Sequence, residues 1–525
     1  MSTRTKAAVT DTLPALFPAV FPGHGVDAPL DLPPVTQQVQ QQITDRLASP
    51  GFDAWSETLA RVGNCSKPIR LHGHSQTVDA TTGEILSSYS SRHEPLGVTH
   101  VRCGNRRAVE CPSCSRLYAA DTFHLIRAGV AGGKTVPETV AENPLVFATV
   151  TAPSFGRVHG RRDGARRCHP TVRGSRRCPH GWPRTCQASH DGGDQLLGHP
   201  LCGECYDNAS HVVWQWWAPD LWRRFSIALR RLVAKTLDVP ASRLADVATV
   251  QYAKVAEYQL RGVVHFHALV RLDGPKTPQG FAPAPPAVDA TVLADLVRQA
   301  AASVRLTVPG VDDHDPNRVL AFGRQLDARP VRTGRRTDDP DRTLTPEQVA
   351  GYLAKYATKS ATDTGNTDSP HHRRIRATAR ELATRARTHA HERGDDEGPY
   401  ERLGKWVHML GFRGHFATKS RRYSVTLGAL RRARRRAQAL IAEHKADGRP
   451  LDLAALEADL LADDEDETTL VIGHWSYAGT GWATEGERVL AVAAAARARE
   501  YDRWKAEQRM QRKHTQKKGQ SDESD

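Results

Sequence analysis

Three signatures are absent from this sequence of 525 residues. No stretch approaches the roughly 18 to 20 continuous apolar residues that a membrane-spanning helix needs, and the N-terminus has no basic segment followed by an apolar core and a cleavage site. There is also no glycine-rich loop ending in a lysine that would cradle the phosphates of a nucleotide. We therefore expect a cytoplasmic protein that has no contact with membranes and that relies on another protein for nucleotide-driven work.

Acidic residues are in the minority. Lysine and arginine outnumber aspartate and glutamate by 73 to 59, and they cluster, as in Arg161-Arg162, Arg373-Arg374 and the run from Arg431 to Arg436. This balance favours a polyanionic partner, although a solvated basic surface would explain the charge equally well. The 39% apolar content is sufficient for buried cores in about three or four domains.

The cysteines are nine, an odd number, and include two Cys-x-x-Cys pairs. In a reducing compartment such pairs favour metal binding over disulfide bonds. The first predicted zinc site has four thiolate ligands, Cys65, Cys103, Cys111 and Cys114. The second is centred on Cys202 and Cys205, with Cys178 and Cys186 as chosen partners and with Cys168, His180 and His190 as competitors. Zn²⁺ would be structural in both sites, because the units that contain them are too small to be stabilised by a hydrophobic core. Ordinary buried thiols are the alternative.

The order of these features predicts an α+β protein with several parts. Residues 1–60 are rich in proline and glutamine and form an N-terminal extension, and residues 61–120 form the four-cysteine zinc module. Residues 140–425 form the central domain, which is interrupted by a zinc module at about 160–210. Residues 426–525 are a helical, charged C-terminal region.

Regular elements are predicted mainly in the central domain. Runs rich in β-branched and aromatic residues predict strands that form a central antiparallel sheet, and periodic or well-capped runs predict helices. The strands are expected at 145–151, 247–259 and 263–272, and the helices at 214–236, with Pro219 near its start, and at 346–359.

The sharpest chemical signal is His265-Phe-His267 within the last of these strands. Side chains alternate across a strand, so the two imidazoles project from one face while Phe266 and its apolar neighbours form the buried face. The preceding strand offers a third ligand, either Glu257 or Gln259. Imidazole and oxygen ligands suit Mg²⁺ or Mn²⁺ with open positions for phosphate oxygens. Two ordinary histidines on an edge strand are the alternative.

A second signal is a stripe of phenols and ammonium groups on the helix at 346–359, formed by Tyr352, Lys355, Tyr356 and Lys359. Residues three and four apart are neighbours on a helix. A phenol with a pKa near 10 is a weak nucleophile at neutral pH, and nearby cations would favour its phenolate form. The alternative is a helix with two half-buried aromatics and two solvated lysines.

In this order, the strand 147–151, the His265-Phe-His267 motif and the tyrosine helix resemble the HUH endonucleases, which are named for two histidines around a hydrophobic residue. In particular, the chain resembles the replication initiators of actinobacterial plasmids and integrative elements, and this resemblance extends over about residues 65–425. It implies an HUH nicking domain in which Glu257 is the third metal ligand. The paired tyrosines also resemble those of the initiator of small icosahedral bacteriophages, in which the two alternate as nucleophiles.

The resemblance implies that the chain nicks origin DNA, single-stranded or in a hairpin. Tyr356 or Tyr352 would attack the scissile phosphate, with Tyr356 favoured for the first cut, and Lys355 and Lys359 would contact phosphate or assist proton transfer. The products would be a 5′-phosphotyrosyl link and a 3′-hydroxyl for a host polymerase, and a host helicase would open the duplex. The same chemistry would serve a conjugative relaxase or a single-strand transposase. A non-catalytic, zinc-dependent DNA-binding regulator is the alternative from another class.

Two basic segments suit DNA binding. The segment 406–423 interleaves aromatic and cationic residues, as surfaces that stack bases and follow phosphates do, or else it is a packed turn with a basic rim. The run from Arg431 lies on an expected helix that would grip phosphates or be a solvated face. The residues predicted to contact DNA are Arg421, Arg422, Arg431 and Arg432.

Overall fold

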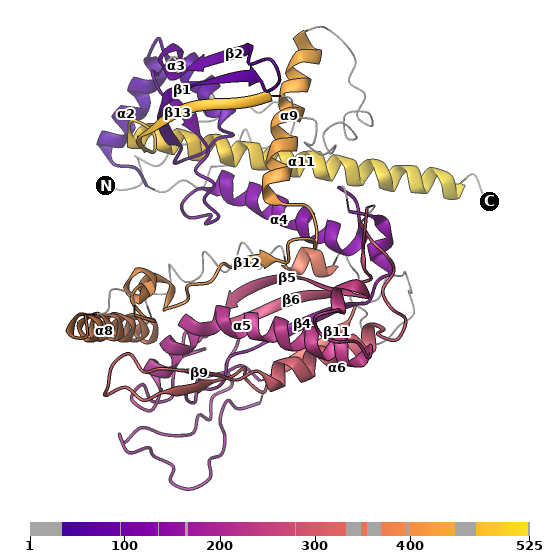
Figure 1. Cartoon of the computed structure of the whole chain (residues 1–525). Coiled ribbons are helices and arrows are strands. Elements are labelled where there is room, and N and C mark those ends of the chain that lie inside the picture. The colour runs from indigo at the N-terminus through magenta and orange to yellow at the C-terminus, as the bar shows by residue number, and fades with distance from the viewer. Residues whose placement is uncertain are drawn as a thin grey trace. The chain divides into compact units, whose positions relative to one another are not determined.

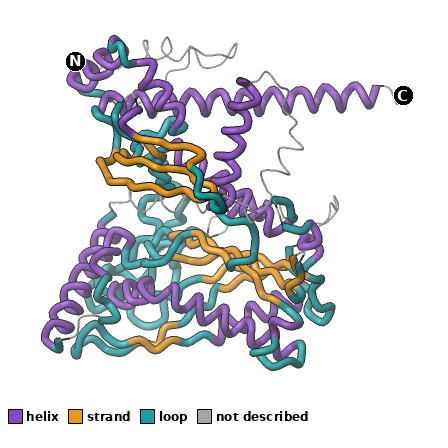
Figure 2. The backbone as a smooth tube through the Cα atoms, turned by 45° about the horizontal axis from the view of Figure 1, so that its top comes forward, coloured by secondary structure: helices purple, strands orange, loops and turns teal. Residues whose placement is uncertain are grey.

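The computed structural model divides the chain into two units. Unit 1 comprises Met1–Tyr118 and Asp463–Asp525, and unit 2 comprises Ala119–Ala462. Helices and antiparallel sheets occur in both, which confirms the predicted α+β class at this level (Figure 2). The structure describes residues 34–94, 96–134, 136–162, 166–278, 280–331, 348–353, 369–394, 398–446 and 469–522.

Unit 1 joins the two ends of the chain in one sheet. β13 (Thr469–Thr480) pairs along the whole of β1 (Ile69–Asp79), which also pairs with β2 (Ile85–Ser90) and β3 (Thr99–Val101), and β13 lies beside β1 in Figure 1. The C-terminal region, expected to be helical and charged over 426–525, therefore also contributes a strand to this sheet. Several apolar residues of β13 are exposed, and the strand that it pairs with is far away in the sequence. The pairing is therefore set by the tertiary fold and not by a local sequence pattern.

Helices from both ends complete unit 1. α2 (Gln37–Ala48) and α3 (Phe52–Arg61) belong to the stretch expected to be an extension, but they pack with α11 (Glu485–Asp522) around a common core. The indole of Trp55 is fully buried there and lies 5.3 Å from that of Trp482, measured between ring centroids. This core also includes Cys65, Cys111 and Cys114, which ties the first cysteine cluster to the packing of the unit.

Unit 2 is built on a five-stranded sheet with the order β11-β4-β6-β5-β12. Its central strands confirm the three predicted ones to within two residues at either end. The strands are β4 (Leu145–Val150), β5 (Thr249–Tyr258), β6 (Val264–Asp273), β11 (Leu326–Pro330) and β12 (Ala417–Lys419), and they pair antiparallel throughout.

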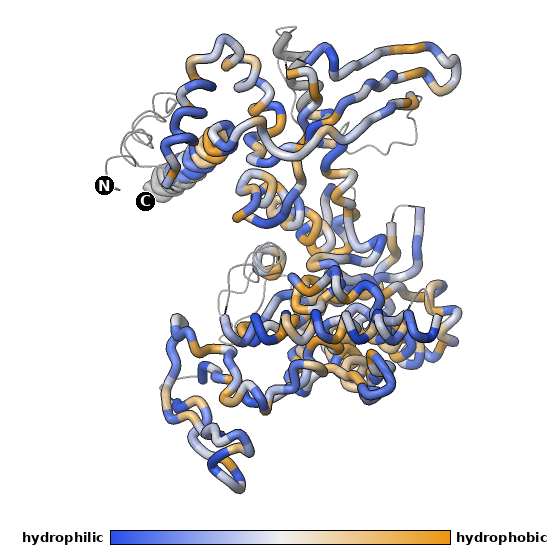
Figure 3. The backbone as a smooth tube through the Cα atoms, turned by 90° about the vertical axis from the view of Figure 1, so that its left-hand side faces the viewer, coloured by the Kyte–Doolittle hydropathy of each residue, from blue (hydrophilic) through white to orange (hydrophobic). Residues whose placement is uncertain are grey.

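One face of this sheet carries the main core. α5 (Asn208–Thr236) and α6 (Ala290–Ser303) pack there with α8 (Pro370–Glu392) and the turn η4 (Leu403–Met409), and Figure 3 shows hydrophobic residues gathered in this region. α5 begins six residues before its expected start because Asp207 caps it by accepting a hydrogen bond from the backbone N–H of Ser210. Pro219 consequently lies inside the helix.

The opposite face of the sheet has a smaller apolar cluster. Residues 348–353 are helical and contribute Val349, Ala350 and Leu353 to it, and the second half of α4 (Pro112–Ala131) contributes Ile126 and Val130. α9 (Leu427–Ala446) follows β12. The remaining elements are short: η1 (Ser91–His93), η2 (Glu138–Glu142), η3 (Leu244–Asp246), β7 (Lys276–Thr277), β8 (Gly280–Phe281), β9 (Leu306–Val308) and β10 (Arg318–Leu320).

Candidate metal centre and tyrosine site

The register of the β5–β6 hairpin brings the two histidines to one carboxylate. Glu257 lies directly opposite His265, and Val255 lies opposite His267. The Nε2 atoms of His265 and His267 are 2.8 and 3.1 Å from Oε2 of Glu257 and 3.1 Å from each other. Gln259 is committed elsewhere, since its Oε1 accepts a hydrogen bond from Nε of Arg261 in the hairpin turn. Glu257 is therefore the carboxylate that joins the pair.

Strand alternation works here as the sequence predicted. Phe266 is fully buried in the main core between the two histidines, whose rings project from the opposite face of β6. Side chains of His265 and Glu257 retain 16% and 17% of their exposure, and that of His267 retains 4%. The three ligand atoms thus converge at a point where Glu257 and His265 keep partial solvent exposure.

The ionisation of this cluster favours cation binding. Burial opposes ionisation of Glu257, but its contacts with His265 and His267 outweigh that effect and lower its pKa to about 2. Burial lowers the pKa of His267, with a smaller opposing effect from Glu257. At neutral pH the cluster therefore presents a carboxylate and a neutral imidazole, which are the forms that bind a metal.

Two residues of β4 position the His267 ring. The hydroxyl of Thr149, directly across the strand pair, is 3.1 Å from Nδ1 of His267, so Nε2 is left facing Glu257. Phe147 lies parallel to the imidazole, with ring centroids 5.8 Å apart. The sequence predicts this strand from its β-branched composition, and the family resemblance includes it, but neither assigns a role to Phe147 or Thr149. The alternation of Phe147 and Thr149 on one face of a strand next to the histidine strand is the signal that identifies them.

Tyr352 is the described member of the predicted tyrosine stripe, and it lies beside the cluster. Its ring meets that of His267 edge-on at 5.4 Å and that of Phe147 at 5.6 Å between centroids. The side chain is 39% exposed, while Val349 and Leu353 on the same helical segment are buried against the sheet. Lys355, Tyr356 and Lys359 lie outside the described residues.

The segment 406–423 is a packed turn with a basic rim. Its aromatics Phe412, Phe416 and Tyr423 are buried in the two cores of unit 2, so they do not stack bases. Arg421 and Arg422 are exposed, as are Arg431 and Arg432 on α9. The structure supports the packed interpretation for these three aromatic residues, whereas Trp406 is half-buried and the four arginines are exposed.

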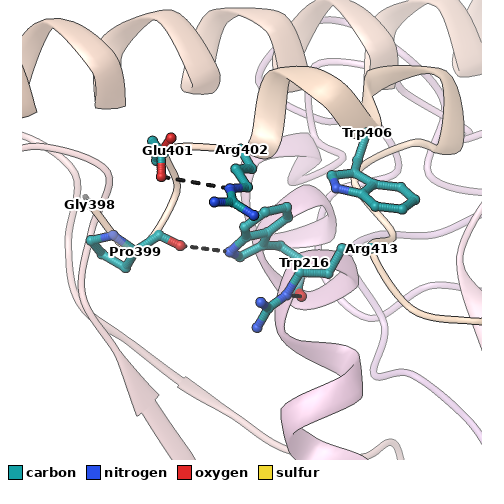
Figure 4. Close-up of a pocket in the computed structure, with 7 residues that line it drawn as sticks. All are labelled: Trp216, Gly398, Pro399, Glu401, Arg402, Trp406 and Arg413. Carbon is teal, nitrogen blue, oxygen red and sulfur yellow. Dashed lines mark hydrogen bonds and ion pairs between the residues drawn. The ribbon is translucent and has the colours of Figure 1, made fainter. Parts of the chain in front are cut away.

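A cleft of about 500 Å³ opens beside this turn. Figure 4 shows Arg402 and Arg413 close to the indole of Trp216, with Trp406 facing them. The guanidinium of Arg413 lies 4.7 Å from the Trp216 ring centroid, and the indole N–H of Trp216 donates to the carbonyl of Pro399 at 2.9 Å. Arg402 lies beside Glu401, Arg413 pairs with Asp220, and the indole of Trp216 is buried. Trp406 is the half-buried aromatic side chain at the cleft.

The first cysteine cluster has the membership that the sequence predicted. The sulfur of Cys65 lies 3.7 Å from that of Cys111 and 3.6 Å from that of Cys114, with Cys103 completing the group. Four sulfurs around one Zn²⁺ at ~2.3 Å would be about 3.8 Å apart, so the spacing fits a tetrahedral thiolate site. All four cysteines are free of disulfide bonds.

The second cluster differs from its prediction in one member. Cys178, Cys202 and Cys205 gather around His180, whose Nδ1 is 3.4 Å from the sulfur of Cys205 and 3.8 Å from that of Cys202. Cys186, which we expected there, belongs to another group of side chains. Spacing along the chain could not separate the two groups, because their members alternate in sequence.

Comparisons with known proteins agree on one family. Residues 51–496 match the family described as RepSA, replication initiator protein, pSAM2. A curated replication initiator protein of Streptomyces ambofaciens is 43% identical over 462 residues, which cover 86% of this chain and 91% of that protein. No solved structure matches the chain. Within the described residues, no helix combines the length and the apolar character needed to cross a membrane.

Proposed function

The chain belongs to the RepSA family of replication initiator proteins, and from this premise we propose that it initiates replication of a plasmid or integrative element by nicking origin DNA with a tyrosine. The observation that carries the proposal is the convergence of Glu257, His265 and His267 on one face of the sheet, with the ring of Tyr352 against His267. This convergence supports the HUH arrangement that the sequence resemblance implies.

The donor set of the cluster fits a divalent cation. Two imidazole nitrogens and one carboxylate oxygen leave open positions, and Mg²⁺ or Mn²⁺ bound there would polarise the scissile phosphodiester and stabilise the charge of the transition state. Glu257, His265 and His267 are the residues that would hold it. Thr149 and Phe147 keep the His267 ring in the orientation that presents Nε2.

The tyrosine helix supplies the nucleophile. A tyrosine oxygen attacks the phosphorus and loses its proton, the bond from phosphorus to the 3′-oxygen breaks, and that oxygen leaves as a 3′-hydroxyl. The 5′ end stays linked to the protein as a phosphotyrosine, and the freed 3′-hydroxyl primes a host polymerase behind a host helicase. We assign the first cut to Tyr356 and the second to Tyr352, with Lys355 and Lys359 at the phosphate.

The exposed arginines would hold the rest of the origin. Arg421, Arg422, Arg431 and Arg432 are exposed and would contact phosphates. Binding of this kind loses affinity steeply with salt, because each neutralised phosphate releases counterions. A nicking domain that acts on single-stranded or hairpin DNA needs phosphate contacts of this kind with each of these two forms of DNA.

The test is a covalent adduct. Incubating the protein with single-stranded origin DNA and Mn²⁺ should give a protein–DNA adduct on a denaturing gel, and a chelator added first should abolish it. The Tyr352→Phe/Tyr356→Phe variant should form none, whereas Tyr477→Phe, an exposed tyrosine of unit 1, serves as the matched control and should react normally.

The single variants separate the two tyrosines. Tyr356→Phe should lose the first adduct, whereas Tyr352→Phe should form it and fail to transfer the strand onward. Plasmid maintenance should fail in the double variant if the chain initiates replication, and DNA transfer alone should fail if it serves mobilisation. Duplex binding without an adduct on either strand would leave a DNA-binding regulator and overturn the nicking proposal.

A further inference from the structure

The insertion between β4 and α5 contains more ligand side chains than one zinc ion requires. Beside the group around His180, four further side chains bring ligand atoms within 4.8 Å of one another: His159, Cys168, Cys186 and His190. We propose that these four residues bind a third structural Zn²⁺ and that the two sites of the insertion are interleaved along the chain, so that the insertion is a cross-braced binuclear module.

The geometry of the new site is that of a closed tetrahedral centre. Nδ1 of His159 is 3.1 Å from Nε2 of His190, which is 3.5 Å from the sulfur of Cys186. Two nitrogens at ~2.0 Å and two sulfurs at ~2.3 Å from one zinc give edges of about 3.3 to 3.8 Å. Two imidazoles and two thiolates fill four positions, so the site is structural and leaves no place for a substrate.

The groups that surround these ligands are those that orient metal ligands. The carboxylate of Asp194 lies 2.5 Å from Nδ1 of His190, so Nε2 faces the other three ligands. The backbone N–H of Gly160 points at the sulfur of Cys168 at 3.3 Å. A carboxylate behind an imidazole and an N–H directed at a sulfur both stabilise the metal-binding forms. The His190 side chain is fully buried. Burying a polar side chain costs free energy, and a bound metal would offset that cost.

The order of the ligands produces the cross-brace. In sequence they form four pairs, and the first and third pairs make one site while the second and fourth make the other. The pairs are His159/Cys168, Cys178/His180, Cys186/His190 and Cys202/Cys205. Neither site can form from one contiguous half of the insertion, so each closes a loop that contains part of the other. Among the described residues, the three clusters that contain cysteine use four, three and two thiols, which accounts for all nine cysteines.

The insertion needs these two metal sites because it has almost no hydrophobic core. Between residues 157 and 205, the described part of the chain forms only isolated bridges, and its buried apolar side chains are three cysteines and Leu197. This is the long loop at the bottom of Figure 1, and it is largely hydrophilic in Figure 3. A unit of this size without a core requires metal or disulfide links to keep one structure.

The base of the insertion connects the module to the nicking sheet. Backbone hydrogen bonds from Asp207 to Phe155 and from Leu201 to Arg157 close its two ends. Gly198 lies against the backbone of Leu260 in the β5–β6 turn, where a Cβ would come within 2.4 Å of the Leu260 carbonyl carbon. The module therefore supports the hairpin that carries Glu257, His265 and His267.

The experiment counts zinc in the full chain. Because the proposed nicking centre could itself take up zinc, the count is made in the His265→Ala/His267→Ala background by native mass spectrometry and by elemental analysis. We expect three zinc ions per chain, whatever the outcome of the nicking assay. A count of two zinc ions in this background would overturn the proposal. The count alone decides this, without a substitution in the proposed third site.

Variants then assign the third ion. Cys168→Ser/His190→Ala in the same background should contain at least one zinc fewer, and the cross-brace predicts that a chelator removes the zinc of the Cys178 site faster as well. The matched control is His169→Gln, next to Cys168 but outside the cluster, where the ring nitrogen contacts the carbonyl of Val158. This control should keep three ions. An unchanged count in the double variant would refute the assignment.

Discussion

Thr149 is expected to influence metal affinity at the Glu257 cluster through its contact with His267. Its hydroxyl is the partner of Nδ1 in His267, and without it the imidazole loses the contact that fixes its orientation. Outer partners of metal ligands typically contribute about 10- to 100-fold in metal affinity. We expect Thr149→Val, which has the same shape, to raise the Mn²⁺ concentration for half-maximal adduct formation by about that factor.

Thr149→Ser supplies the control for this prediction, because it keeps the hydroxyl and removes a methyl group. It should restore the wild-type Mn²⁺ requirement, and both variants should reach a similar adduct yield at saturating Mn²⁺. Equal Mn²⁺ requirements for the valine and serine variants would show that Thr149 does not position His267.

The members of the candidate site were predictable where one local rule applied. Strand alternation predicted His265 and His267 as a pair, and the short hairpin turn left Glu257 and Gln259 as candidates for the third ligand, because both are properties of neighbouring residues. The choice of Glu257 came from the family resemblance. The exchange of Cys186 for His180 was not predictable, since the number of ways to pair ligands rises quickly with their number. Only the folded chain shows which pairs interleave.

At the scale of elements, α5 and β5 meet at a buried cation. Lys254 on β5 is 4% exposed, and its ammonium group lies 4.4 Å from the centroid of Phe266 and 5.3 Å from that of Trp222 on α5. Burial lowers the pKa of Lys254 to about 7. In the unfolded chain it takes its ordinary value near 10.5, so the unfolded state binds the proton more tightly between these two pH values.

This difference predicts how stability depends on pH. As the pH falls from about 10.5 to 7, protonation increasingly favours the unfolded state, and below 7 the penalty is constant. Lys254→Met removes the penalty, so we expect it to raise the Tm of unit 2 by several degrees at pH 7 and by much less at pH 10. Thermal unfolding followed by circular dichroism measures both. A gain of the same size at the two pH values would contradict the predicted titration.

Elements were predicted well where the local pattern and the packing agree. β4, β5 and β6 are rich in β-branched residues and have a buried face, so their bounds follow from sequence. α5 was placed too late because Pro219 reads as a helix start. The buried Val212, Val213 and Trp214 hold the preceding turns in place, so tertiary packing outweighs the ~3 kcal/mol cost of an interior proline.

At the scale of the whole chain, the two ends depend on each other. The indole N–H of Trp482, which follows β13, donates to the carbonyl of Cys65 at 2.9 Å, and its ring stacks on that of His100 with centroids 5.0 Å apart. The sulfur of Cys65 lies within 3.7 Å of those of Cys111 and Cys114 in the first cluster. No sequence pattern predicts this contact, since it joins residues 417 positions apart.

The last prediction follows from that contact. Trp482→Ala removes a ring that is 7% exposed and the donor to Cys65, at a cost of about 3 to 5 kcal/mol to unit 1. The Cys65 cluster should then lose its zinc to a chromogenic chelator many times faster, while Trp504→Ala on α11 should change the rate little. Because Glu257, His265 and His267 belong to unit 2, adduct formation on single-stranded DNA should persist in the Trp482 variant. Unchanged zinc release in Trp482→Ala would mean that the C-terminal segment does not support the cluster.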